Sequence, residues 1–497
     1  MIGEWRVNDI GLFHSIKPFS RQSWTNLACS PEPPPKPMNY IDRRRFLLSL
    51  AGLFGMSALS PELRGVVDDE NELSIDFSAP GYLIPENFLG LSFETIDLLL
   101  DGILSPENRS FISLVRRLST KGVIRIGGNS SDRRSLRRGL TIDRSHIEHL
   151  AAFLSATGWQ LIYGLDLGSG KAEQAAAEAE MVAQIVGPKL LAFQFGNEPD
   201  GFRVDIRKSN YNPPDYIAEW REFLKALRTR VPGAPLAGPD ISFDTGWLPP
   251  FIRAFGSELI FLTCHYYSEG PASSPDVTME KMLGSGEALA KIIDSVAGYT
   301  AGSGLKVRMA ESNSVYEGGK PGISDTLGAA LWGVDVMFTL AEARWLGINF
   351  HGGSNHYTPI AQTSSGAFEP KPLYYAMLLF AYAGRGSLVP IHTRGIRPWL
   401  RAFAVRGIGG EHQVILVNKD LAQNEHVRLA TTGQRATILR LTAHSAESKS
   451  GLTFGGASVG PNGDWAPRVA QSVPLKADRF VVEVPAASAA VLRIHTE

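Results

Sequence analysis

Two stretches of the sequence each carry a glutamate at the end of a run of strand-forming residues. Residues 190–196 are mostly apolar, and Asn197, Glu198 and Pro199 follow them directly. A second run of the same design, which we expect to form a strand over residues 306–311, ends on Glu311. Apolar runs of this length are typical of buried strands, and a carboxyl group at their C-terminal end is well placed for catalysis. We therefore take Glu198 and Glu311 as candidate catalytic residues.

A pair of carboxyl groups suits the cleavage of glycosidic bonds. The transition state is oxocarbenium-like, and it needs one protonated carboxyl group that donates to the leaving oxygen and one carboxylate that faces the anomeric carbon. The negative charge of one group raises the pKa of the other, which gives the two groups different protonation states. A separation of about 5 Å leads to direct attack and retention, whereas a wider gap admits water and leads to inversion. The sequence leaves the separation of Glu198 and Glu311 open.

The elements that must position these residues follow a strand–helix order. We expect eight short strands, at residues 88–94, 122–128, 160–167, 190–198, 235–240, 259–267, 306–311 and 347–352. Helical patterns lie between them, at residues 109–120, 145–157, 171–186, 214–230, 286–296 and 324–346. This alternation predicts an α/β fold, a (β/α)8 TIM barrel. An open doubly wound sheet is the alternative, but it would need a glycine-rich turn after its first strand, and residues 91–95 contain no glycine.

The character of the sequence changes after the last of these helices. Apolar and polar residues then alternate between glycine and proline turns, as at residues 413–418 and 480–484. This pattern predicts an additional antiparallel β-sandwich domain. We place the catalytic barrel at residues 88–380 and the sandwich at residues 381–497. Residues 64–87 include a strand at 73–77 that we expect to join the sandwich.

Residues 1–63 are expected to be a disordered N-terminus followed by an export signal. Arg43 and Arg44 precede an apolar run at residues 46–59, which is too short to cross a bilayer as a helix. The paired arginines resemble a twin-arginine signal, so we expect a periplasmic or secreted protein with no stable membrane span after signal cleavage. An uncleaved amphipathic start is the alternative. Cleavage near residue 59 would leave Cys264 alone, and we expect it to be a buried small hydrophobe.

Composition excludes some classes of partner. The chain has 49 lysines and arginines against 50 acidic residues, so it lacks the basic excess of a nucleic-acid binder. Polar residues gather at the predicted strand ends: Glu94, Asn129, Asp132, Asp166, Asp240, His265 and His351. They show no His-x-His or Glu-x-x-His spacing, so we expect no metal and no cofactor.

At this point the residues resemble a known family. The Asn197-Glu198-Pro199 motif, Glu311, and a barrel followed by a sandwich resemble the clan A retaining glycoside hydrolases. More narrowly, residues 311–319 (Glu-Ser-Asn-Ser-Val-Tyr-Glu-Gly-Gly) and 125–129 (Arg-Ile-Gly-Gly-Asn) resemble glycoside hydrolase family 79. That family contains β-glucuronidases and heparanases, and the chain looks most like a bacterial β-glucuronidase.

The resemblance implies a role for each site residue. Glu198 matches the general acid/base and Glu311 the nucleophile of a double displacement through a covalent glycosyl-enzyme. Tyr267 matches a tyrosine that holds the nucleophile, although a packing aromatic is an equally good interpretation. The remaining matches bind the terminal sugar: Asn197 its 2-hydroxyl, Glu94 and Asn129 other hydroxyls, and Tyr316, Gly318 and Tyr357 the uronate carboxylate.

The resemblance predicts an exo-β-glucuronidase that acts on a β-glucuronide-containing oligosaccharide or glycan. An endo-acting, heparanase-like glycosidase is one alternative, and Arg133-Arg134 with Arg137-Arg138 would suit its polyanionic substrate. Such runs are more often solvated surface. Glu317 also departs from heparanases, which carry a glycine-rich run directly after the tyrosine. The other alternative is a non-catalytic carbohydrate-binding barrel, which would be expected to lack one of the two glutamates.

Overall fold

The computed structural model describes residues 71–100, 103–133, 136, 141–353, 355–468 and 470–495. The expected disordered segment and export signal, including Arg43 and Arg44, lie outside these residues. Arg134, Arg137 and Arg138 lie outside them as well. Within the described part of the chain, we find no helix that combines the length and apolar character needed to cross a membrane.

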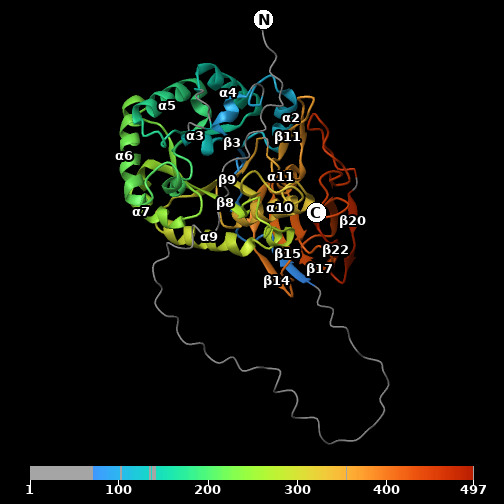
Figure 1. Cartoon of the computed structure of the whole chain (residues 1–497). Helices are drawn as coiled ribbons and strands as arrows, with labels where there is room; N and C mark the ends of the chain where they lie inside the picture. Colours follow the sequence, from blue (N-terminus) through green and yellow to red (C-terminus); the bar gives the residue numbers. More distant parts are fainter. Residues whose placement is uncertain are drawn as a thin grey trace, which may run out of the picture. The chain divides into compact units, whose positions relative to one another are not determined.

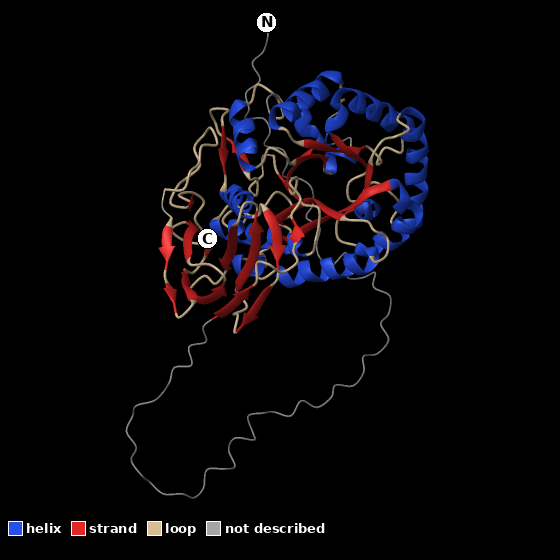
Figure 2. Ribbon diagram, turned by 180° about the vertical axis from the view of Figure 1, so that it is seen from behind, coloured by secondary structure: helices blue, strands red, loops and turns tan. Residues whose placement is uncertain are grey.

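Eight parallel strands close into a barrel, which confirms the predicted (β/α)8 architecture (Figures 1 and 2). Closure comes from the pairing of the last strand with the first, where Ile348 lies opposite Leu89. The strands follow in chain order around the barrel: β3 (Leu89–Glu94), β4 (Val123–Gly127), β5 (Gln160–Leu165), β6 (Leu190–Phe195), β7 (Leu236–Ile241), β8 (Leu259–Glu269), β9 (Val307–Val315) and β10 (Ile348–His351).

Helices surround the barrel strands in Figure 2. The longer ones are α2 (Arg109–Leu118), α4 (Arg144–Thr157), α5 (Ala172–Val186), α6 (Pro213–Arg230), α7 (Leu248–Phe255), α9 (Gly286–Thr300), α10 (Leu327–Glu342) and α11 (Pro372–Ala383). Helices α7 and α11 were not among the expected helices, and both contain proline in the first turn. Proline is tolerated in the first turn of a helix, where its missing N–H has no partner within the helix.

The last barrel strands differ from the expectation. We expected Glu311 to end its strand, and this was wrong, because β9 continues to Val315 and stays paired with β8 as far as Glu269. The polar residues after Glu311 look like a loop in the sequence. In the structure Ser312 Oγ donates to the carbonyl of Tyr266 at 2.7 Å, so the strand accommodates this polar side chain. Glu311 thus lies in the middle of a long strand, whereas Glu198 lies three residues beyond the end of β6.

The C-terminal region forms two further sheets, which confirms the predicted additional antiparallel domain. One has the strand order β19-β18-β23-β16-β15-β13-β2, with β20 paired to β18, and the other the order β14-β1-β17-β22-β21. One pairing departs from the antiparallel rule, since β1 runs parallel to β17. The strands are β1 (Asn71–Ile75), β2 (Tyr82–Leu83), β13 (Gly386–Val389), β14 (Ile391–Arg394), β15 (Leu400–Gly407), β16 (Glu411–Asn418), β17 (Glu425–Thr431), β18 (Arg435–Thr442), β19 (Thr453–Phe454), β20 (Gln471–Val473), β21 (Leu475–Lys476), β22 (Arg479–Val484) and β23 (Ser488–His495).

The helices α10 and α11 are buried on nearly every side. They contact each other and strand β16, so they lie between the barrel and the sandwich. A charged cluster joins the two domains at this interface. Asp335 on α10 accepts a hydrogen bond from Arg401 Nε of β15 at 2.9 Å and forms a close ion pair with Lys419, which follows β16. The second domain is thereby fixed to the helix layer of the barrel.

The barrel interior changes from apolar to polar along its axis. One end is filled by an apolar layer that includes Val123 and Ala192. Residues two apart in a strand face the same side, so Arg125 and Gln194 continue these interior positions toward the C-terminal end. Both are fully buried. Cys264 on β8 is also buried and free, as the sequence analysis predicted.

Candidate active site

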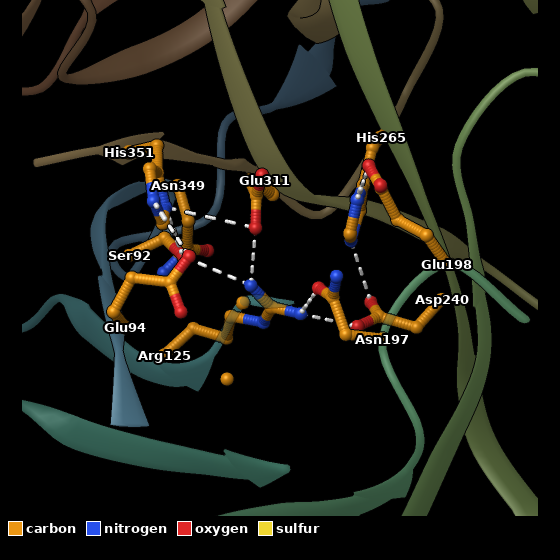
Figure 3. A network of polar contacts seen from close by, with 12 residues as sticks. Ser92, Glu94, Arg125, Asn197, Glu198, Asp240, His265, Glu311, Asn349 and His351 are labelled. Atoms are coloured by element: carbon orange, nitrogen blue, oxygen red, sulfur yellow. Dashed lines mark hydrogen bonds and ion pairs between the residues drawn. The ribbon is translucent and has the colours of Figure 1, made fainter. Parts of the chain in front are cut away.

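Arg125 on β4 is the centre of a polar network at the C-terminal end of the barrel (Figure 3). Its Nη1 donates to Glu311 Oε2 at 2.5 Å and to Ser92 Oγ at 3.1 Å. Its Nη2 donates to Asn197 Oδ1 at 2.7 Å and forms a close ion pair with Asp240. A planar guanidinium with several donors in a fixed geometry suits this bridging role. Arg125 therefore links four of the barrel strands or the loops that follow them.

Glu311 is held in its ionised form. Tyr267 donates its hydroxyl proton to Glu311 Oε1 at 2.8 Å, and His351 Nδ1 lies 3.6 Å from Oε2. The side chain is 8% exposed. Burial alone would raise the pKa of Glu311. The positive charges of His351, His265 and Arg125, in that order of effect, outweigh burial and hold this pKa well below its usual range. Glu311 therefore carries the charge that a nucleophile needs.

The surroundings of Glu198 favour its protonated form, in contrast to those of Glu311. It has a left-handed backbone with φ of 52°, and its N–H donates to the carbonyl of Asp240 at 2.9 Å. Burial raises the pKa of Glu198, and its hydrogen bond with His265 lowers it by less, so the net shift is upward. The side chain remains 24% exposed, so its carboxyl group can reach a substrate.

His265 on β8 connects Glu198 to the Arg125 network. Its Nδ1 lies 3.0 Å from Glu198 Oε1, and its Nε2 lies 3.1 Å from Asp240 Oδ1. Burial lowers the pKa of His265, but the carboxylates of Asp240 and Glu311 outweigh burial and raise it to about 10. Both ring nitrogens face acceptors, which suits a doubly protonated imidazole. The sequence analysis placed His265 and Asp240 at strand ends but gave them no role.

The two glutamates lie close together. One oxygen of Glu198, one oxygen of Glu311 and one ring nitrogen of His265 lie within 4.8 Å of one another. A trio of this kind also has the spacing of a metal site, but a ligating histidine must be neutral. Because its carboxylate neighbours favour the charged form of His265, the electrostatics of the trio suit proton transfer better than metal ligation. That the protein uses no metal stays a prediction.

Asn197 is fixed on both sides. Its backbone N–H donates to Asp132 Oδ2 at 2.7 Å, and its side-chain oxygen accepts from Arg125. Asp132 Oδ1 also accepts from the backbone N–H groups of Leu167 and Gly168, at 3.0 and 2.8 Å. One buried carboxylate therefore holds the loops after β5 and β6 together, and it positions Asn197 beside Glu198.

Glu94 and Asn129 lie together on the other side of Glu311. Glu94 Oε1 accepts from the backbone N–H of Asn129 at 3.1 Å, and its Oε2 accepts from the backbone of Ser130 at 2.7 Å. Glu94 Oε1 also lies 3.8 Å from His351 Nε2. The Asn129 side chain points elsewhere, since its oxygen accepts from Arg133. The structure thus brings Glu94 into the network, whereas the Asn129 side chain contacts Arg133.

Three tyrosines that the sequence analysis selected form a cluster. The ring centroid of Tyr267 lies 6.1 Å from that of Tyr357 and 6.4 Å from that of Tyr316. Gly318 follows with φ of 83°, a conformation that favours glycine, and its carbonyl accepts from the backbone of His356 at 2.8 Å. Because Tyr267 bonds Glu311, this cluster lies on the Glu311 side of the site.

Comparison with known proteins also indicates a glycosidase. The model of the glycosyl hydrolase family 79 C-terminal beta domain matches residues 402–491. A beta-glucuronidase of Neurospora crassa is 26% identical over 373 residues, which cover 62% of this chain and 65% of that protein. A heparanase of Mus musculus is 27% identical over 263 residues, which cover 48% of this chain and 46% of that protein. The chain therefore spans just under two thirds of the first relative and about half of the second.

A solved structure shares the fold over its whole length. The 4-O-α-L-rhamnosyl-β-D-glucuronidase of Fusarium oxysporum has a TM-score of 0.72 and 17% identity, and the match covers 85% of this chain and 100% of that chain. The Neurospora crassa relative and a second beta-glucuronidase, from Aspergillus niger, are fungal, whereas we had expected bacterial relatives. The domain match and these relatives agree: the C-terminal part of the chain matches the family 79 beta domain, and the chain is similar to beta-glucuronidases and heparanases.

Proposed function

We propose that this protein is a retaining exo-β-glucuronidase, which removes terminal β-linked glucuronic acid from an oligosaccharide or glycan. The observation that carries the proposal is the pair Glu198 and Glu311. Carboxylate oxygens of the two lie within 4.8 Å, and their surroundings shift their pKa values in opposite directions. This spacing is close to the separation of about 5 Å that retaining enzymes use. The beta-glucuronidases among the relatives support the choice of sugar.

In the first step, Glu198 donates its proton to the glycosidic oxygen while Glu311 attacks the anomeric carbon. The bond to the leaving group breaks, and a covalent glycosyl-enzyme forms on Glu311. The negative charge of Glu311, which raises the pKa of Glu198, is then gone. In the second step, Glu198 takes a proton from water, the oxygen of that water attacks the anomeric carbon, and Glu311 leaves as a carboxylate.

His265 and Arg125 stabilise the charged forms of the two glutamates during these steps. His265 faces Glu198 at 3.0 Å and stabilises its carboxylate after the proton has left. Arg125 and Tyr267 hold Glu311 so that its oxygen has a fixed position for attack. Such preorganised charges stabilise a transition state more than solvent does, because they do not reorganise during the reaction.

Selectivity for glucuronic acid is assigned to Tyr316, Gly318 and Tyr357. A tyrosine hydroxyl and a backbone N–H can hold a carboxylate without an ion pair, so the geometry of the hydrogen bonds decides the selectivity. The rings of Tyr316 and Tyr357 both lie beside that of Tyr267, which supports this assignment, since the sugar that Glu311 attacks must lie against the same cluster.

Exo action is favoured over cleavage within a sulfated polymer. Arg133 is the described member of the arginine cluster that would have bound a polyanion. Its guanidinium donates to both oxygens of Asp205, at 2.7 and 3.0 Å, so its charge is neutralised within the protein. Glu317 adds a negative charge after Tyr316. Both features disfavour a chain of many negative charges.

Matched 4-nitrophenyl β-glycosides test the proposal. We expect the wild type to hydrolyse the glucuronide and not the glucoside, xyloside or arabinofuranoside, and we expect Glu311→Gln to abolish this turnover. Glu287→Gln, an exposed change on α9, is the matched control and should keep full activity. Turnover of another sugar would replace the proposed specificity. Cleavage of a heparan chain without turnover of any nitrophenyl glycoside would favour the endo-acting alternative.

A further inference from the structure

Phe243 is an aromatic side chain that the catalytic scheme does not use. It lies two residues after the end of β7, in the loop at the C-terminal end of the barrel. Its side chain is 60% exposed, although phenylalanine is among the residues most often buried. An exposed aromatic ring at the edge of a candidate active site is available to contact a substrate by its apolar face.

The backbone around Phe243 is fixed by hydrogen bonds to one carboxylate. Asp200, which is 3% exposed, accepts hydrogen bonds from the N–H groups of Ser242, Phe243 and Asp244 at 2.9, 3.0 and 3.1 Å. Asp200 comes two residues after Glu198 in the same loop. One buried carboxylate therefore fixes the position of the Phe243 backbone relative to the general acid.

The Phe243 ring also belongs to the aromatic cluster of the site. Its centroid lies 5.9 Å from that of Tyr316, and the ring planes meet at 66°. Tyr316 in turn contacts Tyr267, whose hydroxyl bonds Glu311. A continuous series of rings thus leads from the nucleophile to the exposed phenylalanine at the rim.

We propose that Phe243 is the platform on which the leaving group of the substrate stacks. This inference rests on the proposed function, because Glu198 must face the oxygen of the leaving group. The leaving group then lies on the Glu198 side of the site, and the loop that carries Phe243 is tied to Glu198 through Asp200. A rigid aromatic surface binds a flat ring or the apolar face of a sugar ring by dispersion and apolar burial. The ligand is a leaving group with such a ring face.

Three substrates with the same glucuronyl group separate this role from a general one. The first has an aromatic leaving group, the second a pyranose leaving group, and the third, β-glucuronyl fluoride, has no ring in its leaving group. We expect Phe243→Ala to lower kcat/KM about tenfold for at least one ring substrate, mainly through KM, and to leave the fluoride unchanged. Phe243→Trp should keep the wild-type values. Tyr299→Ala, which removes another exposed ring from α9, is the matched control and should change none of the three.

The pattern of losses identifies the ligand or overturns the proposal. A loss with the aromatic substrate alone identifies an aryl leaving group, and a loss with the pyranose identifies a sugar. If Phe243→Ala lowers kcat/KM equally for all three substrates, or for neither ring substrate, the proposed stacking role of Phe243 is wrong. Failure of the proposed function looks different, because the wild type would then cleave none of the three glucuronides.

Discussion

Two buried charge networks in the described part of the chain, one at the barrel–sandwich interface and one at the candidate active site, are built differently. At the barrel–sandwich interface one carboxylate, Asp335, is paired with two cations, Arg401 and Lys419. At the candidate active site Arg125 and two histidines are surrounded by several carboxylates, Glu198, Asp240 and Glu311 among them. The interface network pairs its buried acid, Asp335, with both cations, and its second acid, the exposed Glu342, lies 3.9 Å from Arg401. The site network neutralises Glu311 and Asp240 but leaves Glu198 with a raised pKa. We infer that the first network stabilises the fold and that the second sustains a difference in protonation.

The largest expected effect is on activity, from the site network. In the proposed mechanism Glu198→Ala removes both the acid of the first step and the base of the second, so kcat should fall by about 10²- to 10⁴-fold. The free energy of unfolding should change little, because the Glu198 side chain is 24% exposed. Turnover of 4-nitrophenyl glucuronide with and without azide measures the first effect, since azide can attack the glycosyl-enzyme without a base. A loss that azide does not relieve, with a glucuronide whose leaving group needs no acid, would argue against this role.

The interface network predicts the reverse pattern. Asp335→Ala leaves Lys419 buried without its partner, which should lower the free energy of unfolding by about 3–5 kcal/mol. Activity below the unfolding transition should be unchanged. Denaturant unfolding and the glucuronide assay measure the two quantities on the same sample. The charge-free pair Asp335→Leu with Lys419→Met should restore most of the stability, and failure to do so would mean that the ion pair is not the cause.

A smaller effect is expected from the hydrogen bond that holds the nucleophile. Tyr267→Phe keeps the ring in the aromatic cluster and removes the donor to Glu311, so kcat/KM should fall about tenfold or somewhat more. The same substitution at Tyr374, whose hydroxyl bonds the carbonyl of Leu114 within the helix layer, is a control that should not change kcat/KM. Equal kinetics for Tyr267→Phe and the wild type would assign Tyr267 to packing.

The smallest expected effect is a shift in the pH dependence of kcat/KM when His265 is replaced. The dependence of kcat/KM on pH should be bell-shaped, because Glu311 must be ionised and Glu198 protonated. His265 lowers the pKa of both groups. His265→Gln should therefore move both limbs of the profile to higher pH. Movement of either limb to lower pH would contradict the electrostatic role assigned to His265.

Much of the fold could be predicted because strands in a closed barrel are apolar runs of regular length. The eight predicted strands all formed, and the two glutamates could be selected because each follows such a run. The end of β9 was missed, since Ser312 and Asn313 look like loop residues in the sequence. Their side chains bond backbone carbonyls of neighbouring segments, and those partners are known only once the chain has folded.

The electrostatic pairing of the site could not be predicted for the same reason. Arg125 belonged to a recognised motif, yet nothing in its neighbourhood in the sequence indicates Asp240 or Glu311 as partners. His265 also had two acids within reach that lie far away along the chain. Residue types and strand positions were enough to select the candidate residues, whereas their protonation states depend on distances between segments that are far apart in the sequence.

In the proposed mechanism Glu311 is the nucleophile and forms a covalent intermediate. A 2-deoxy-2-fluoro-β-glucuronyl fluoride tests it directly, because the ring fluorine destabilises the oxocarbenium-like transition states and the good leaving group still allows the first step. We predict that mass spectrometry will find one fluoroglucuronyl group on the peptide that contains Glu311, and none on the Glu311→Gln variant. An adduct on another carboxylate, or turnover to an inverted product without any adduct, would contradict the account.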